Sequence, residues 1–341
     1  MQELSNDIAS SESTEGAQSL PFEFRGDGVE YFKIWIVNVL LTILTLGIYS
    51  AWAKVRSNRY FYSNFYLDGE SFRYLANPIT ILKSRIIAVL LFVVYLVLVN
   101  YSTLVSTLSV VAVMLASPFF IVRSIAFSNR MTAYRNIQFR FRGDYPQAFA
   151  AIIGWPILGV LTLGILYPFS MRKLNEFIVN NSSYGTARFQ FTAKTNDYVV
   201  ILLRFILIML PVGFFGGIFL NFVPLVGAFI LVAGYMAGMA FLMTRTTNLY
   251  FNASQLGAHG FDSRLEIPGL LSIYATNFLL TVITLGLFLP FAKVRLARYR
   301  ANCLTLLAAS SLDGFIAAEQ EQVNALGEEL GEVFDFDIGA I

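Results

Sequence analysis

Charged residues are scarce in this sequence. Only 13% of its 341 residues are Asp, Glu, Lys or Arg, whereas soluble proteins carry about 25%. Hydrophobic residues make up 56%, and the mean hydropathy is +0.63. Residues 86–122 and 205–244 contain no charge, and each run is about twice the ~20 residues that one helix needs to cross a bilayer. We therefore predict a membrane protein in which each run forms a helical hairpin.

Residues with reactive side chains are equally scarce. The single cysteine, Cys303, excludes an intramolecular disulfide and a cysteine metal cluster, and the single histidine, His259, is a weak basis for a metal site. No GxxxxGK loop, HExxH helix or GxSxG turn occurs. Most acidic residues lie in the two tails, so the apolar segments lack a carboxylate pair for proton relay. The basic residues follow the membrane edges. We predict no enzyme, no cofactor or metal, and no nucleic-acid binding.

A phrase that occurs three times organises the hydrophobic segments of the sequence. TLGIYSAWAKVR begins at Thr45, TLGLFLPFAKVR at Thr284, and a weaker copy, TLGILYPFSMRK, at Thr162. We call these the TLG phrases, and each lies in a long apolar segment. The three TLG segments are residues 34–53, 145–171 and 267–292. With the two hairpins they make seven hydrophobic segments.

Short alternating stretches follow the apolar segments. IQFRF (137–141) and RFQF (188–191) are typical of strands with one apolar face. Such strands cannot lie unpaired in lipid, so we expect them outside the hydrocarbon. Arg123 and Arg245 come directly after the two predicted hairpins, and each precedes a phenylalanine by 16 residues. Arg56, at the end of the first TLG phrase, precedes a phenylalanine by the same distance. We predict a polytopic all-α membrane protein with internal repeats and a small extramembrane cap of short β-strands.

This organisation divides the chain into three parts. Acidic ends with little hydrophobic pattern predict solvated tails. The parts are a disordered acidic N-terminal tail (1–20), a polytopic membrane domain (21–303) and an acidic C-terminal tail (304–341). The membrane domain holds three TLG repeats, about 22–75, 138–192 and 259–303, and two helical hairpins, about 79–122 and 198–244.

The TLG phrases and their surroundings resemble a known family. FEFRGDGVEYF, NVLLTILTLGIYSAWAKVRSNRYFY and NFLLTVITLGLFLPFAKVRLARY are similar to the YjgN-like family of bacterial multi-pass inner-membrane proteins, whose function is unknown. The resemblance covers roughly residues 22–299. It implies a multi-pass protein of the bacterial inner membrane, and it supplies no substrate, cofactor or catalytic residue.

The distribution of basic residues allows two topologies. If all seven segments span, residues 54–85, 123–142 and the stretch after 292 face the cytoplasm with six, five and four basic residues, but 172–204 faces outward with five. If instead the TLG segments dip into the membrane and return, every basic stretch is cytoplasmic. We favour seven spans, because 20 to 27 uncharged residues are ample for a helix and the positive-inside rule tolerates exceptions.

Basic and aromatic residues beside the TLG segments are candidates for contact with anionic headgroups or a ligand. Such clusters ordinarily anchor a protein in the interface. The sharper hypothesis is recognition of an anionic lipid or ligand by a pseudo-symmetric ring of Arg56, Arg172 and Arg295. The full set is Trp52, Lys54, Arg56, Arg59, Arg172, Lys173, Lys293 and Arg295.

Polar and small residues inside the apolar segments form a second set of candidates. Asn38 and Asn277 occupy matching repeat positions, where they form interhelical hydrogen bonds or line a pore. Glycines at GxxxG spacing in the second hairpin let helices approach closely, and the TLG glycines with nearby prolines break their helices. These residues are Gly213, Gly217, Gly234 and Gly238, and Gly47, Gly164, Pro168, Gly286 and Pro290.

The repeated, broken apolar segments suggest a function. Related units around a central site are common in transporters. We predict transport or channel-like handling of a small solute or lipid; the alternative is a non-catalytic scaffold that organises lipids or partner proteins. The expected partners are membrane lipids with anionic headgroups, and a homo-oligomer is left open.

Overall fold

The computed structural model describes residues 18–338, with side chains as far as residue 325 within the last helix. Ten antiparallel strands close into a barrel in the order β1-β10-β9-β8-β7-β6-β5-β4-β3-β2. The strands are β1 (Gln18–Phe24), β2 (Phe65–Leu67), β3 (Glu70–Tyr74), β4 (Thr132–Tyr134), β5 (Ile137–Phe141), β6 (Ser182–Tyr184), β7 (Ala187–Phe191), β8 (Ser254–Leu256), β9 (His259–Ser263) and β10 (Leu304–Ala308). The predicted all-α fold with a small cap of strands is therefore wrong, because the strands form a closed barrel.

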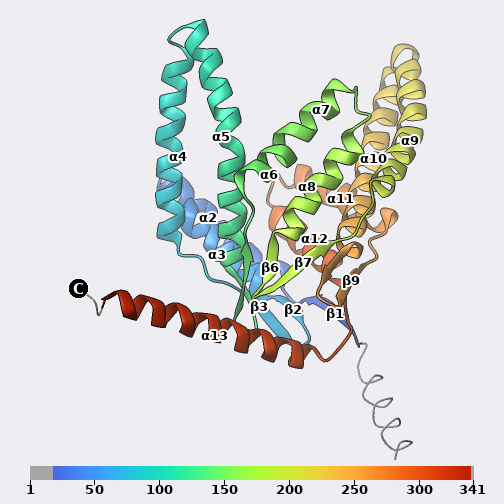
Figure 1. Cartoon of the computed structure of the whole chain (residues 1–341). Coiled ribbons are helices and arrows are strands. Elements are labelled where there is room, and N and C mark those ends of the chain that lie inside the picture. Colours follow the sequence, from blue (N-terminus) through green and yellow to red (C-terminus); the bar gives the residue numbers. More distant parts are fainter. Residues whose placement is uncertain (1–17, 339–341) are drawn as a thin grey trace, which may run out of the picture.

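Five helical hairpins rise from one end of this barrel (Figure 1). The first is α2 (Gly28–Leu44) with α3 (Ser50–Ser63), and the second is α4 (Pro78–Val99) with α5 (Thr103–Arg130). The third is α6 (Tyr145–Phe149), a π-helical turn (Ala150–Gly154) and α7 (Trp155–Leu161), returning through α8 (Tyr167–Asn180). The fourth is α9 (Thr195–Phe222) with α10 (Pro224–Asn252), and the fifth is α11 (Ile267–Ile283) with α12 (Leu289–Asn302). A last helix, α13 (Leu312–Ile338), crosses the opposite end of the barrel (Figure 1).

All five hairpins are copies of one unit. At the foot of each, a backbone N–H that follows one strand donates to a carbonyl that precedes the next, over 2.8–2.9 Å. The five pairs are Arg25 to Asn64, Leu75 to Met131, Arg142 to Asn181, Thr192 to Ala253 and Arg264 to Cys303. The repeat visible three times in the sequence is thus fivefold in the structure, since the two long hairpins are the same unit with longer helices.

The TLG phrases are hairpin turns. In the first, Leu46 adopts a left-handed conformation (φ 47°) and Gly47 follows with φ 93°. The Gly47 N–H donates to the carbonyl of Thr42 at 2.8 Å, closing a Schellman-type helix end that needs glycine's freedom. The chain then returns, because β1 and β2, which flank this hairpin, pair with each other. Both ends of a TLG segment therefore lie on the same side, and the seven-span topology favoured from the sequence is wrong.

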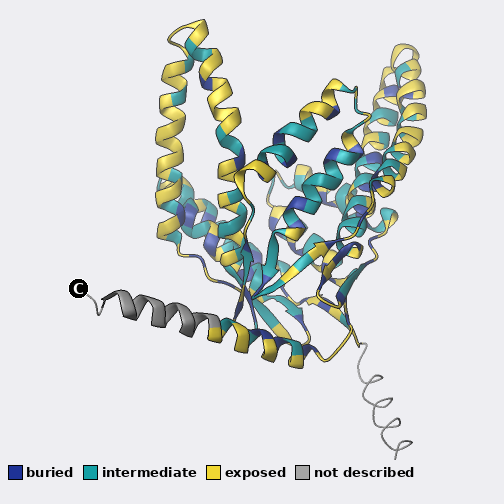
Figure 2. Cartoon of the chain, in the orientation of Figure 1, coloured by how far each residue is buried: buried dark blue, intermediate teal, exposed yellow. Residues whose placement is uncertain are grey.

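Only the long hairpins match the thickness of a bilayer. Within residues 18–338, four helices are long and apolar enough to cross a membrane: α4, α5, α9 and α10. The helix α2 has 17 residues, about 25 Å, and is therefore shorter than the ~30 Å hydrocarbon core. The leucines at the three TLG turns are 94–95% exposed, which suits contact with lipid. Figure 2 shows exposed residues along the long hairpins and buried ones concentrated around the barrel.

Aromatic side chains fill the barrel. One phenylalanine from every second strand points inward, and successive ring centroids lie 6.4–6.5 Å apart. We call this set the phenylalanine ring: Phe22, Phe72, Phe139, Phe189 and Phe261. Each member is opposite one residue of a second buried layer, formed by Leu67, Tyr134, Tyr184, Leu256 and Leu306. The barrel lumen is therefore a packed core.

The C-terminal region belongs to this core. Residues 304–308, assigned to an acidic tail from the sequence, form β10, which closes the barrel between β9 and β1. Leu312 and Ile316 of α13 are buried against the barrel residues. The assignment of residues 304–341 to a tail is thus corrected as far as the described residues extend. Most of the predicted N-terminal tail (1–17) lies outside the described residues, and residues 18–20 begin β1.

Candidate functional site

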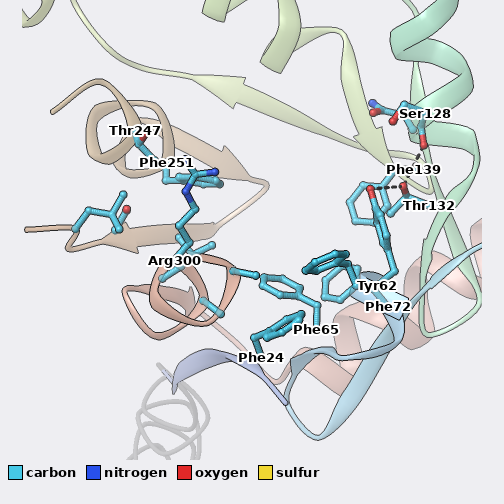
Figure 3. Close-up of a pocket in the computed structure, with 17 residues that line it drawn as sticks. Phe24, Tyr62, Phe65, Phe72, Ser128, Thr132, Phe139, Thr247, Phe251 and Arg300 are labelled. Atoms are coloured by element: carbon cyan, nitrogen blue, oxygen red, sulfur yellow. Dashed lines mark hydrogen bonds between the residues drawn. The ribbon is translucent and has the colours of Figure 1, made fainter. Parts of the chain in front are cut away.

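A cavity of about 590 Å³ lies where the helices leave the barrel. The ends of α3, α5, α10 and α12 contribute its walls, and Phe72 and Phe139 of the phenylalanine ring separate it from the barrel lumen. Figure 3 shows the rings of Phe24, Phe65 and Phe72 gathered on one side. The lining residues are Phe24, Phe61, Tyr62, Phe65, Phe72, Ser128, Asn129, Thr132, Phe139, Thr247, Phe251, Ser263, Leu265, Ala297, Arg300, Ala301 and Leu304.

The cavity combines aromatic walls with a few polar groups. Among the residues that the structure describes, Arg300 is the one charged residue in the lining, and its Nη2 donates to the Tyr274 hydroxyl at 3.4 Å. The Thr132 hydroxyl donates to the Tyr62 hydroxyl at 3.4 Å on the opposite wall (Figure 3). An apolar cavity with a small number of fixed polar groups is the usual form of a small-molecule site. This one could hold an apolar chain with one anionic group.

The returning helix of every hairpin carries a cation at the same height. Each of these cations lies seven residues before the last residue of its helix, about 10 Å above the barrel. An aromatic residue precedes each one by four positions, one turn further into the membrane. The cations are Arg56, Arg123, Lys173, Arg245 and Arg295, and the aromatics are Trp52, Phe119, Phe169, Phe241 and Phe291. We call the five cations the cation belt.

The cation belt faces away from the cavity. Cavity residues on the returning helices lie one, two or five positions before the helix end, which is about 140–240° around the helix from the belt position. Between the cation belt and the hairpin tips the helices carry hardly any charge, whereas basic residues are frequent near the barrel. From the positive-inside rule we expect the barrel on the cytoplasmic side of the membrane and the belt near the inner headgroups.

The cation belt therefore differs from the predicted arginine ring in its members, and it faces away from the cavity. Lys173, nine residues after its TLG glycine, is the counterpart of Arg56 and Arg295, and Arg172 corresponds to Val55. The Arg172 Nε donates to the carbonyl of Ala193 at 3.0 Å. The structure thus does not gather the three predicted arginines around one ligand. Contact of the basic residues, including Lys54, Arg59 and Lys293, with anionic headgroups stays a prediction.

Asn38 and Asn277 lie between the two arms of their own hairpins. The Asn38 side-chain amide donates to the Ala53 carbonyl at 3.5 Å, and that of Asn277 donates to the Ala292 carbonyl at 3.3 Å. The Asn277 Oδ1 also accepts from Arg295 Nη1 at 2.9 Å. Both side chains are buried. This is the geometry of an interhelical hydrogen bond rather than of a pore lining.

The predicted packing residues divide into two groups. A methyl group added at Gly234 or Gly238 would meet side chains of α9, whereas one added at Gly213 or Gly217 would meet open space. The face of α9 that approaches α10 is marked instead by Gly216, against Leu231. The TLG glycines Gly47, Gly164 and Gly286 form the turns, and Pro168 and Pro290 begin helices, where proline is well tolerated.

A family model described as "Bacterial protein of unknown function (DUF898)" matches residues 19–333, which is nearly the whole barrel, all five hairpins and most of α13. The chain belongs to this family. A relative named "Inner membrane protein YjgN" from Salmonella typhimurium is 22% identical over 340 residues, covering 82% of this chain and 86% of the relative. Proteins of the same name from Escherichia coli O157:H7 and strain K12 are each 29% identical, over 163 and 154 residues, covering 48% and 45% of this chain and 40% and 39% of those proteins.

No solved structure matches this chain. Together with the apolar hairpins, the named relatives identify a multi-pass protein of the bacterial inner membrane, as the resemblance predicted. The function of the family is unknown. Among the described residues no group of three or more His, Cys, Asp or Glu is placed to hold a metal ion.

Sequence reasoning missed the contact between α13 and the barrel. The buried Glu319 carboxylate accepts hydrogen bonds from the Thr186 N–H and hydroxyl, both at 2.8 Å, and from the Ala187 N–H at 3.2 Å. The ring of His259 packs edge-on against Phe315, with 4.6 Å between centroids, and its burial lowers the pKa of His259. Leu312, Phe315, Ile316, Glu319 and Val323 share one face of α13 at i, i+3, i+4, i+7 and i+11. That helical spacing of apolar residues was the sequence signal for a helix that packs on the barrel.

Proposed function

We propose that this family member binds a membrane amphiphile, with an apolar chain and an anionic group, in the cavity at the barrel mouth. The observation that carries the proposal is the cavity's composition: most of its lining is aromatic or aliphatic, and among the described residues Arg300 is its one charge. The apolar part of the ligand contacts the rings of Phe24, Phe61 and Phe65. Its anionic group pairs with Arg300.

The cavity's position supports a lipid-derived ligand. Two of the hairpins that border it, α2–α3 and α11–α12, have exposed leucine tips that fit within the cytoplasmic leaflet, so lipids of that leaflet lie near the cavity. A continuous aqueous pore has less support. The phenylalanine ring and the layer beneath it fill the lumen, and α13 covers its far end. Beyond the TLG tips, the four long helices are all that residues 18–338 offer to surround a path across the outer leaflet.

Filling the cavity tests this function. We expect Ala297→Trp to lose most of the lipid that co-purifies with the full chain, because the indole occupies the space between the aromatic walls. Native mass spectrometry of protein in detergent with added phosphatidylglycerol measures the bound lipid. Ala318→Trp, at an exposed position of α13, is the matched control and should retain it. Equal lipid occupancy in the wild type and Ala297→Trp would contradict the proposal.

A further inference from the structure

Four arginines gather on the outer wall of the barrel, away from the cavity already described. Two cavities of about 330 and 150 Å³ adjoin here, and both are lined by Arg140 and Arg142. Arg130, the last residue of α5, lines the first, and Arg188 of β7 lines the second. We call this region, between the end of α5, β5 and the turn from α8 to β6, the arginine cleft.

Within the described part of the chain, these four guanidinium groups have no acidic partner. No carboxylate lines either cavity, and the salt bridges of the described residues join other arginines and lysines. The nearby Glu319 is committed to Thr186 and Ala187. Gathering like charges costs free energy unless an opposite charge offsets it. The cleft therefore has the electrostatics of an anion site.

The fivefold repeat supplies an internal comparison. Glu23 of β1 pairs at 2.8 Å with Arg25, the residue after that strand, and Asp262 of β9 pairs at 2.7 Å with Arg264, the residue after its strand. The corresponding positions are Arg140 in β5 and Arg142 just after it, so an arginine stands where those two copies have the partner carboxylate. The remaining copies have Arg73 with Leu75 and Gln190 with Thr192.

The end of α5 also differs from the other copies by an added positive charge. The other returning helices end on small or amide side chains, namely Ser63, Asn180, Asn252 and Asn302. Only α5 ends on a cation, Arg130. Two independent departures from the repeated pattern thus add positive charge to one place.

We propose that the arginine cleft binds phosphate groups carrying two or more negative charges. Guanidinium forks bind phosphate oxygens through paired hydrogen bonds, and four of them can neutralise a diphosphate. Neutral donors complete the lining. The Asn180 Oδ1 accepts the Phe191 N–H at 2.8 Å, which leaves its amide nitrogen as an available donor beside the Ser183 hydroxyl.

The distance of the cleft from the membrane favours a soluble phosphate compound. Arg130 lies seven residues beyond Arg123 of the cation belt, about 10 Å further from the membrane. A lipid headgroup with two phosphates, such as that of cardiolipin, carries the same chemistry, so the experiment separates the two sources. This site is distinct from the amphiphile cavity, and its test does not depend on that proposal.

The test measures binding of sodium pyrophosphate to the full chain in detergent micelles by isothermal titration calorimetry. We expect saturable binding that weakens as NaCl is raised, because exposed charges are screened. The double variant Arg140→Gln/Arg142→Gln should weaken it at least tenfold, and Arg188→Gln by a smaller factor. The matched control, Arg25→Gln/Arg264→Gln, changes the position equivalent to Arg142 in two copies where that arginine is already paired, and it should bind as the wild type does.

A second arm distinguishes the source of the phosphate. The protein is placed in nanodiscs of phosphatidylcholine with or without cardiolipin, whose headgroup carries two phosphates, and the pyrophosphate titration is repeated. Unchanged binding assigns the cleft to soluble phosphates, whereas competition by cardiolipin that is lost in Arg140→Gln/Arg142→Gln assigns it to headgroups. Absence of both pyrophosphate binding and lipid competition, or equal binding by the double variant and the control, would overturn the proposal.

Discussion

Replacing Glu319 by leucine is expected to release α13 from the barrel at a cost of about 3 kcal/mol. The carboxylate is buried and accepts three hydrogen bonds from Thr186 and Ala187, two of them from backbone N–H groups. Leucine would leave the two backbone N–H groups without a partner, and an unsatisfied buried donor costs about 1–3 kcal/mol. Hydrogen exchange of the peptide that contains residues 312–325 measures the release, since its amides should exchange far faster in the variant.

The same helix offers the control for this experiment. Glu321, two residues further along, is exposed and has the same side chain, so Glu321→Leu should leave the exchange of α13 unchanged. Glu319→Gln keeps one acceptor oxygen and should fall between the wild type and Glu319→Leu. If Glu319→Leu and Glu321→Leu exchange alike, the carboxylate does not hold α13 in place.

Gly227→Ala is expected to destabilise the long α9–α10 hairpin by about 3 kcal/mol. A Cβ atom at this position would overlap the backbone of α9, at Leu220 and at Phe219, whose carbonyl carbon would be 2.6 Å away. Backbone cannot turn aside as a side chain can, so the two helices must separate, and overpacking of this kind costs about 1–3 kcal/mol or more. Thermal unfolding of the purified protein in micelles should show a lowered midpoint.

Gly217 provides the matched position on the facing helix. An added Cβ there meets nothing within 4 Å, so Gly217→Ala should leave the unfolding midpoint unchanged or raise it slightly by favouring the helix. Equal midpoints for Gly227→Ala and Gly217→Ala would show that the close approach of α9 and α10 does not contribute to stability.

The repeat was only partly predictable from the sequence. The TLG phrases are visible because glycine is required at their turns, where the φ angles are 90–93°. The two long hairpins turn without that phrase, so the cation at Arg123 and at Arg245 was the remaining sign that they are the same unit. The fivefold register of aromatic and cation became clear only when the helix ends were known.

The sequence patterns did not predict the closed barrel, for a physical reason. Its strands have three to seven residues, and each hairpin of helices separates two strands that become neighbours. Closure depends on the pairing of β1 with β10, where Leu20 lies opposite Leu306. Local alternation predicts such strands but does not predict their partners. The expectation of a small cap followed from this limit.

The error in topology came from counting apolar residues across a turn. Residues 34–53 contain most of α2, the turn at Gly47 and the start of α3, so their length resembled one span.

The error in the C-terminal region had a different origin. Acidic composition suggested a tail, although the apolar face from Leu312 to Val323 has helical spacing and packs on the barrel.

The central claim is that the TLG hairpins enter the membrane from the cytoplasm and return, with the barrel on that side. Cysteine accessibility in whole cells tests it most directly, using Cys303→Ala as the background. Single cysteines replace Arg25 and Lys54 on the two sides of the first TLG turn, and Tyr101 in the turn between α4 and α5. A membrane-impermeant maleimide is applied from outside the inner membrane and, separately, to inverted vesicles.

We expect Arg25→Cys and Lys54→Cys to react only in inverted vesicles, and Tyr101→Cys to react only from the outside. The same-side result should hold for Asp144→Cys and Lys173→Cys around the third hairpin. If Arg25→Cys and Lys54→Cys react from opposite sides of the membrane, the TLG segment spans the bilayer. The closed barrel then cannot exist as described, because β1 and β2 would lie on opposite sides.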